Sequence, residues 1–198
     1  MYVMRIGDLL HFSPNFKFSE LDWNDSDRLI EAFEDRVLGF YLNPAEKLCK
    51  NGDGFACGVL CSTAIDFVAG IETEERDVGP RIKEWLSSHI GDFARNISAT
   101  SNRTFAELFY LNFRNGLIHE GRIKELGQFS YDTPEIVSMK DGVMLVNPQL
   151  LLTEVKSAFL RYCDKLRNDE SILNEFRRNM IRNFGEEVNR AKQLRTHR

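Results

Sequence analysis

The chain has 198 residues, 42% of them apolar, and a formal net charge of -4 at pH 7. This length and apolar content suffice for one sizeable core, so we expect a single domain over residues 1–198. The acidic balance argues against a protein whose main task is to coat nucleic acid, because non-specific binding of that kind depends on neutralised phosphates.

The N-terminal part of the chain predicts an arm followed by a long helix. Residues 1–20 show no clear period, which indicates an N-terminal arm or a short strand packed on the body. A helix is expected over residues 24–43, with Asp25 or Ser26 as its cap, because apolar residues then recur at three-to-four spacing. Pro44 disfavours helix in the residue before it, so the helix should end there.

The middle of the chain predicts several further helices. A short helical piece through Cys49 precedes a helix over residues 55–71 that is apolar nearly all round, which marks it as central. Gly79-Pro80 opens the next helix, which carries apolar residues on one face. After a polar loop over residues 94–102, a fourth helix is expected from about Thr104 to Gly121, with the glycine as its C-terminal stop.

The last third of the chain predicts a hairpin and two helices. Asp141-Gly142 lies between two runs rich in β-forming residues, which is typical of a β-hairpin. Two helices follow, over about 148–167 and about 170–192. The expected fold class is therefore all-α, a bundle of about five to six helices over residues 21–128 and 147–192, with a small β-hairpin inserted near 129–146.

The cysteines and the N-terminus bear on the compartment. Four cysteines at irregular spacing are too few for a disulfide framework and indicate a reducing compartment. Cys57 and Cys61 are interpreted as small core residues rather than zinc ligands, which would require further Cys or His partners. The chain lacks a signal-peptide layout and an uninterrupted apolar run of about 20 residues. We therefore expect a cytoplasmic protein with no membrane association.

One short segment, Arg114-Asn115-Gly-Leu-Ile-His119, places a permanent cation, an amide and an imidazole close together. An Arg and a His at similar spacing also occur elsewhere in the chain, so the spacing alone is a weak signal. Two features distinguish this segment: Asn115 directly follows the Arg, and the segment ends a strongly apolar helical run over residues 105–113. On a regular α-helix, Asn115 and His119 would share one face, with Arg114 on the neighbouring side.

In this order, Arg114, Asn115 and His119 resemble the R-N-x-x-x-H signature of HEPN domains. These are helical proteins that often act as metal-independent endoribonucleases and work as dimers. The resemblance implies that His119 acts as general base or acid, that Arg114 binds the scissile phosphate, and that Asn115 orients the site or holds the helix in place. It further implies an RNA substrate, a cyclic phosphate end on the product, and no metal or cofactor.

A homodimer is expected because one His and one Arg supply only part of the base, acid and cation that the reaction needs. A two-fold axis would bring two copies of the motif into one cleft. The apolar residues Phe109, Leu111 and Phe113 are compatible with such an interface and equally with deep burial. Under the HEPN resemblance, the chain could be the toxin of a toxin–antitoxin pair or a component of an anti-phage defence system. In either role, an antitoxin or another regulatory protein would be a further partner.

Asp66 interrupts the apolar helix over residues 55–71, and a buried carboxylate needs a partner. In HEPN proteins, an acidic or polar residue of an earlier helix often lies near the motif helix. Asp66 is therefore expected to pair with Arg114 or to orient His119. A capping or salt-bridged Asp at the rim is the alternative, and Glu72 competes for the same role.

A second function class stays open, namely a non-catalytic HEPN-like module that binds RNA, a nucleotide or a protein partner through the same groove. The acidic net charge favours this module, because a free ribonuclease usually gains on-rate from a positive field. The intact Arg, Asn and His favour the nuclease. The chain lacks a P-loop, a G-x-G-x-x-G and a nucleophile elbow, so nucleotide hydrolysis, dehydrogenase and serine-hydrolase chemistry are unsupported.

Overall fold

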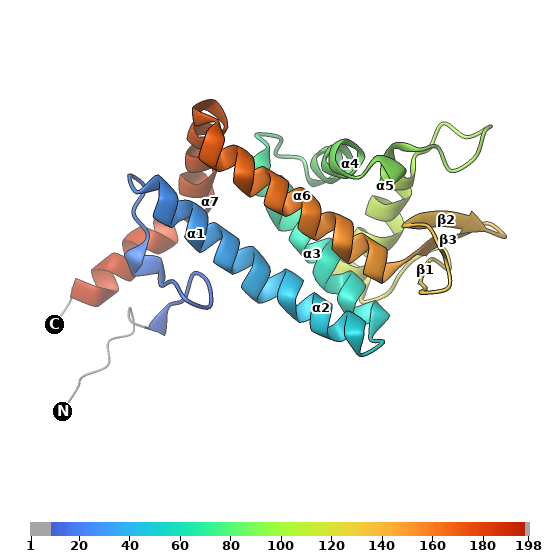
Figure 1. Cartoon of the computed structure of the whole chain (residues 1–198), viewed down its shortest axis with the longest axis horizontal. Coiled ribbons are helices and arrows are strands. Elements are labelled where there is room, and N and C mark those ends of the chain that lie inside the picture. Colours follow the sequence, from blue (N-terminus) through green and yellow to red (C-terminus); the bar gives the residue numbers. More distant parts are fainter. Residues whose placement is uncertain (1–8, 197–198) are drawn as a thin grey trace. The chain divides into compact units, whose positions relative to one another are not determined.

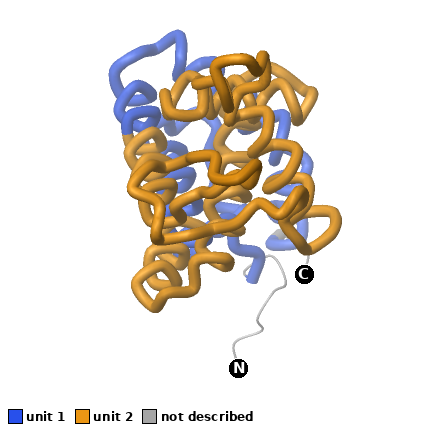
Figure 2. The backbone as a smooth tube through the Cα atoms, turned by 90° about the vertical axis from the view of Figure 1, so that its right-hand side faces the viewer, with its two compact units in different colours: residues 1–40, 161–198 blue, residues 41–160 orange. Residues whose placement is uncertain are grey.

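The computed structural model describes residues 9–196 and is mostly helical, with one small three-stranded sheet (Figure 1). The helical class with a small β insertion is thus confirmed. Contacts divide the chain into two compact units, residues 1–40 with 161–198 and residues 41–160 (Figure 2). The expectation of a single domain stays a prediction.

The first unit holds α1 (Ser26–Val37), α7 (Glu170–Thr196) and the chain that precedes α1. Residues 1–8 of the expected arm lie outside the described residues. The remainder of that arm is packed, because Phe12 is fully buried and its ring meets the Phe184 ring edge-on at 5.1 Å. The guanidinium of Arg36 lies 4.9 Å from the centre of the Phe12 ring and also donates to the Phe12 carbonyl.

The helix expected to end before Pro44 instead continues. Asp25 caps α1, its side chain accepting from the backbone N–H of Arg28, and a π-helical turn over Leu38–Leu42 leads into α2 (Asn43–Lys50). Proline lacks an N–H, and in a regular α-helix its ring crowds the carbonyl four residues earlier. The wider π turn, which bonds residue i to i+5, relieves this conflict and lets the helical path pass Pro44.

The second unit is built around α3 (Gly54–Glu72), which contacts α2, α4 (Val78–His89), the motif helix and the first strand. This confirms the prediction of a central helix. Near the motif, α5 (Phe105–Leu108) continues through π-helical turns over Phe109–Arg114 and Gly116–Glu120. These helices and the sheet are labelled in Figure 1.

The helix Gly54–Glu72 is also long and apolar enough to cross a membrane, by length and composition alone. It is the helix that the sequence predicts to be apolar nearly all round, and Asp66 interrupts its apolar run. However, 56% of its most apolar window is buried inside the protein. Burial of this kind is what the core helix of a soluble protein shows.

The sheet has the order β1-β3-β2, with β1 at Gln128–Phe129, β2 at Val137–Lys140 and β3 at Val143–Val146. Strands β2 and β3 form the predicted hairpin, and Asp141 and Gly142 both have positive φ, as a tight hairpin turn requires. Strand β1 was not predicted. It pairs parallel to β3 and spans only two residues, too few to show an alternating pattern.

The two C-terminal helices are confirmed as α6 (Pro148–Asn168) and α7. Asn147 precedes α6, and its side-chain oxygen accepts from the backbone N–H groups of Gln149 and Leu150. This is how an Asn before a helix satisfies the first unpaired N–H groups. The loop over residues 94–102 and the stop at Gly121, where φ is +66°, also agree with the expectation.

Candidate functional site

The motif helix begins as the sequence predicts and then departs from α-helical geometry. Thr104 caps it, accepting from the backbone N–H of Glu107, whose carboxylate accepts from the Thr104 N–H in return. From Phe109 to Glu120, however, the backbone is mostly π-helical. The regular α-helix expected around the motif is therefore replaced by π-helical turns, in which residues four apart, such as Asn115 and His119, still lie on about the same side.

The widened turns bring the two ends of the motif together. The Nη1 atom of Arg114 lies 3.4 Å from Nε2 of His119 and 3.1 Å from the side-chain oxygen of Asn115. Gly116 opens the second π-helical turn, and a Cβ there would collide with the carbonyl of Arg122. A glycine is thus required where the chain after the helix folds back on it. Arg114, Asn115 and His119 form one contiguous cluster.

Arg114 is held from α3 by Asp66. Its Nη2 and Nε atoms lie 2.5 and 3.2 Å from one carboxylate oxygen of Asp66. The sequence predicts that Asp66 either pairs with Arg114 or orients His119, and the structure shows the pair with Arg114. The Arg114 side chain is only 12% exposed, so its guanidinium is fixed by its surroundings and not free to move in solvent. A partly buried ion pair of this kind fixes the orientation of the planar guanidinium group of the arginine.

A second arginine, Arg81 of α4, completes this arrangement. Its Nη2 atom donates to the other oxygen of Asp66 at 2.8 Å, so one carboxylate lies between two guanidinium groups. The group therefore keeps a net positive charge next to His119. The contacts to Asp66, Asn115 and His119 use at most four of the five N–H donors of Arg114, which leaves a donor for an anionic ligand.

His119 differs from the other motif residues because it is exposed, near the end of the helix. In the neutral tautomer with the proton on Nδ1, its Nε2 atom can accept from Arg114. A neutral imidazole can take a proton from a ligand and an imidazolium can give one. The cluster thus presents a titratable group to solvent beside a fixed cation.

Glu72, the competing candidate, lies in a different contact group. Its carboxylate accepts from the indole N–H of Trp85 at 2.7 Å and pairs with Nε2 of His89 at 3.0 Å. On α4 itself, no carboxylate stands three or four residues before His89. Its partner comes from α3, which spacing along one helix cannot reveal.

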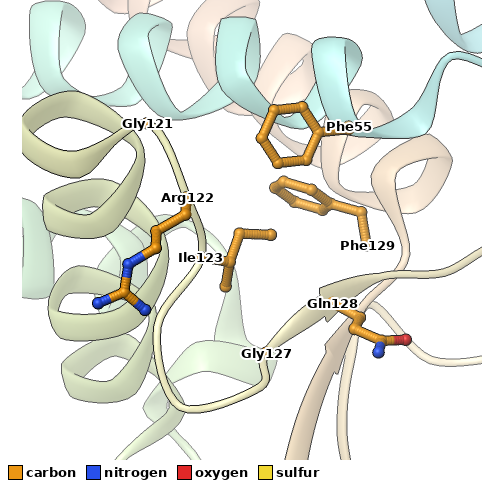
Figure 3. A pocket seen from close by; sticks show the side chains of 7 residues that line it. All are labelled: Phe55, Gly121, Arg122, Ile123, Gly127, Gln128 and Phe129. Carbon is orange, nitrogen blue, oxygen red and sulfur yellow. The ribbon is translucent and has the colours of Figure 1, made fainter.

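Sequence reasoning missed Arg81 and a pocket beside the end of the motif helix. The pocket has a volume of about 350 Å³ and is lined by the chain after Gly121 together with two aromatic rings, those of Phe55 and Phe129 (Figure 3). Arg122 and Lys124, in the same chain segment, both pair with Glu120, at 2.8 and 2.5 Å. No periodicity marks such a pocket, because its walls come from separate parts of the sequence.

Within residues 9–196, no three His, Cys, Asp or Glu side chains lie close enough together to hold a metal ion. The carboxylate that contacts Arg114, that of Asp66, is already shared by two arginines, and such a cationic donor set suits an anion better than a divalent metal.

Comparison of the chain with protein-family models, with curated proteins and with solved structures found no match. The resemblance to HEPN domains therefore stays a prediction, which rests on Arg114, Asn115 and His119 of the sequence.

Proposed function

We propose that the chain is a metal-independent endoribonuclease of the HEPN type, acting in the cytoplasm. The observation that carries the proposal is the placement of Arg114. Its guanidinium is oriented by Asp66, and its Nη1 atom lies 3.4 Å from the imidazole of His119. A fixed cation next to a group that can exchange protons near neutral pH is the pair that cleavage of a phosphodiester needs.

In the proposed reaction, a base takes the proton of the ribose 2′-hydroxyl, and the 2′-oxygen attacks the adjacent phosphorus. The bond from phosphorus to the 5′-oxygen breaks, and an acid gives that oxygen a proton. The products are a 2′,3′-cyclic phosphate and a 5′-hydroxyl. Arg114 stabilises the charge that develops on the phosphate oxygens, and His119 serves as base or acid. Asn115 and Asp66 position Arg114 through the contacts described above.

A homodimer completes this scheme. One chain offers one motif imidazole, whereas the reaction uses one group to take a proton and another to give one. A two-fold axis near the exposed His119 places a second motif opposite the first. Control by an antitoxin or another regulatory protein would suit a nuclease that acts as a toxin or in defence against phage.

The test uses a short RNA of defined sequence and the same RNA with every 2′-hydroxyl methylated, both incubated with purified protein in EDTA. The account predicts cleavage of the unmodified RNA only, with a cyclic phosphate on the upstream fragment and a 5′-hydroxyl on the downstream one. Cleavage of the methylated RNA, or a 5′-phosphate on the product, would rule out the proposed chemistry.

The second candidate is a non-catalytic module that binds RNA, a nucleotide or a protein through the same surface. The net charge of -4 favours it, because a free ribonuclease usually gains on-rate from a positive field. The two candidates differ in their dependence on the imidazole. If expression of the parent chain slows cell growth, His119→Ala should remove the effect for a nuclease and preserve it for a binding module.

A further inference from the structure

The pocket beyond the motif helix joins two exposed features of different chemistry. Figure 3 shows the rings of Phe55 and Phe129 one above the other, with the side chain of Ile123 facing them. Phe55 is 51% exposed although it is a large apolar side chain. The pocket has a volume of about 350 Å³, which is at the small end of the range for ligand sites. An exposed ring at the mouth of a small pocket is suited to stacking against a flat ligand.

The aromatic wall is rigid because it continues a row of rings from the core. The rings of Phe109 and Phe113 stack at 5.3 Å, that of Phe113 meets Phe129 at 5.1 Å, and Phe55 follows at 6.4 Å. On its other side, the Phe129 ring covers Gly58, where a Cβ would collide with it. Phe129 is therefore held in place, and only Phe55 at the rim is free to adjust to a ligand.

The side of the pocket opposite the rings carries one cation, Arg122. Figure 3 shows Arg122 pointing away from the rings. Arg122 pairs with Glu120 of the motif helix, as Lys124 also does. Two cations thus share the carboxylate of Glu120, and Glu125 of the adjoining loop balances the second positive charge. Arg122 is well exposed, so a phosphate can take the place of Glu120 as its partner without loss of a buried ion pair.

The pocket lies close to the motif in the chain. Gly121, part of its lining, is two residues after His119, so their Cα atoms are at most about 7.6 Å apart. Glu125 and Leu126 in the adjoining loop both have positive φ, a conformation that is costly for residues other than glycine. The loop thus keeps an unfavourable backbone next to the pocket, a feature that is frequent where a ligand is bound.

We propose that this pocket binds one unpaired base of a single-stranded RNA, stacked on Phe55, with the neighbouring phosphate on Arg122. Stacking on an aromatic ring tolerates every base and requires a base that is not paired in a duplex. The strand then continues from Arg122 toward Arg114 and His119. The assignment of the bound strand as the substrate rests on the proposed nuclease function, whereas the stacking itself does not.

The test measures binding and uses the full chain with His119→Ala, so that cleavage cannot interfere. A fluorescently labelled single-stranded RNA 12-mer is titrated and its Kd determined. Adding Phe55→Ala should raise the Kd about tenfold, the usual scale of one base–aromatic contact, and Phe55→Trp should restore tight binding. The matched control is Leu126→Ala, which removes a 77% exposed side chain from the adjoining loop, outside the pocket lining, and should change the Kd less than twofold.

Two further arms identify the ligand. The same RNA annealed to its complement should bind more weakly and should not depend on Phe55. Free AMP or UMP should displace the 12-mer only at far higher concentration than unlabelled 12-mer does. Equal Kd values for Phe55→Ala and Leu126→Ala, dependence of duplex binding on Phe55, or displacement by a mononucleotide at similar concentration would each overturn the proposal.

Failure of the nuclease proposal would look different. A parent chain that does not cut RNA, together with binding that depends on Phe55, would remove the catalytic assignment and keep the pocket. Cleavage that depends on His119, together with binding that is indifferent to Phe55, would do the reverse.

Discussion

At the scale of single residues, the site is organised by Asp66. Its two oxygens accept from two different arginines, Arg114 at 2.5 Å and Arg81 at 2.8 Å. If the carboxylate loses its charge, two partly buried guanidinium groups lose their shared partner. Arg114 then has no fixed orientation, and an error of about 1 Å in placing a group at the reacting phosphate can cost about a hundredfold in rate.

We predict that Asp66→Asn lowers the rate of RNA cleavage by about tenfold to a hundredfold. It should also destabilise the fold by about 1–3 kcal/mol, because the pair is partly exposed and so costs less to break than a fully buried one. Initial rates and thermal unfolding measure the two effects. The matched control is Glu72→Gln, which removes the other carboxylate paired on α3 but should keep cleavage, since Glu72 binds Trp85 and His89. Equal losses of activity in both variants would show that Asp66 stabilises the fold and does not position Arg114 for cleavage.

Only part of this site could be predicted from the sequence. A carboxylate in an apolar helix demands a cation, which made the partnership of Asp66 with Arg114 a reasonable expectation. Arg81 could not be found in this way, because its approach to Asp66 depends on how α3 packs against α4 and not on spacing within either helix. The same holds for the pairing of Glu72 with His89.

At the scale of elements, the predicted helices and the hairpin are present, but the π-helical turns are not visible in the sequence. Hydrophobic spacing distinguishes helix from strand, and over a single turn the π and α periods differ too little to show. Strand β1 is set by contact with α3: Phe129 can lie there because Gly58 has no side chain. A glycine in a helix normally lowers stability, and at position 58 the close approach of Phe129 explains its presence.

Two glycines of α3 give a matched test of this contact. Gly58→Ala should destabilise the protein by about 1–3 kcal/mol, because the added Cβ displaces the Phe129 ring and the better helix propensity of Ala does not offset the strain. Gly70→Ala should be neutral or stabilise by up to about 1 kcal/mol, since its nearest neighbour would be Arg81 at 3.4 Å, an ordinary contact. Chemical denaturation of the three proteins compares them. A Gly58→Ala protein as stable as the parent would show that Phe129 does not depend on this glycine.

At the scale of the whole molecule, the account requires a dimer whose interface lies near His119. The sequence left open whether Phe109 and Phe113 lie in an interface or in the core. Both side chains are fully buried, so they belong to the core and cannot contact a second copy. Leu111 and Ile118 on the same helix are 44% and 45% exposed. These two side chains are the apolar groups that a second chain can cover. The sequence could not separate the buried from the exposed members of this run, because the run is apolar on more than one side.

We predict that Leu111→Asp combined with Ile118→Asp yields a folded monomer without cleavage activity, because a charge buried in an interface without a partner is strongly unfavourable. Sedimentation velocity measures the mass, and circular dichroism checks the fold. Leu126→Asp, at a more exposed position outside the helix, should leave both dimer and activity intact. A monomeric variant that cuts RNA at the parent rate would show that one chain suffices.

The most direct test of the central claim is cleavage of total cellular RNA by the purified chain in EDTA, comparing the parent with His119→Ala and Arg114→Ala. His11→Ala serves as the control, since His11 is an exposed histidine outside the motif. The account predicts that the parent and His11→Ala cut the RNA in the presence of the chelator and that both motif variants lose at least a hundredfold in rate. Absence of cutting by the folded parent, or cutting that persists in both motif variants, would contradict it.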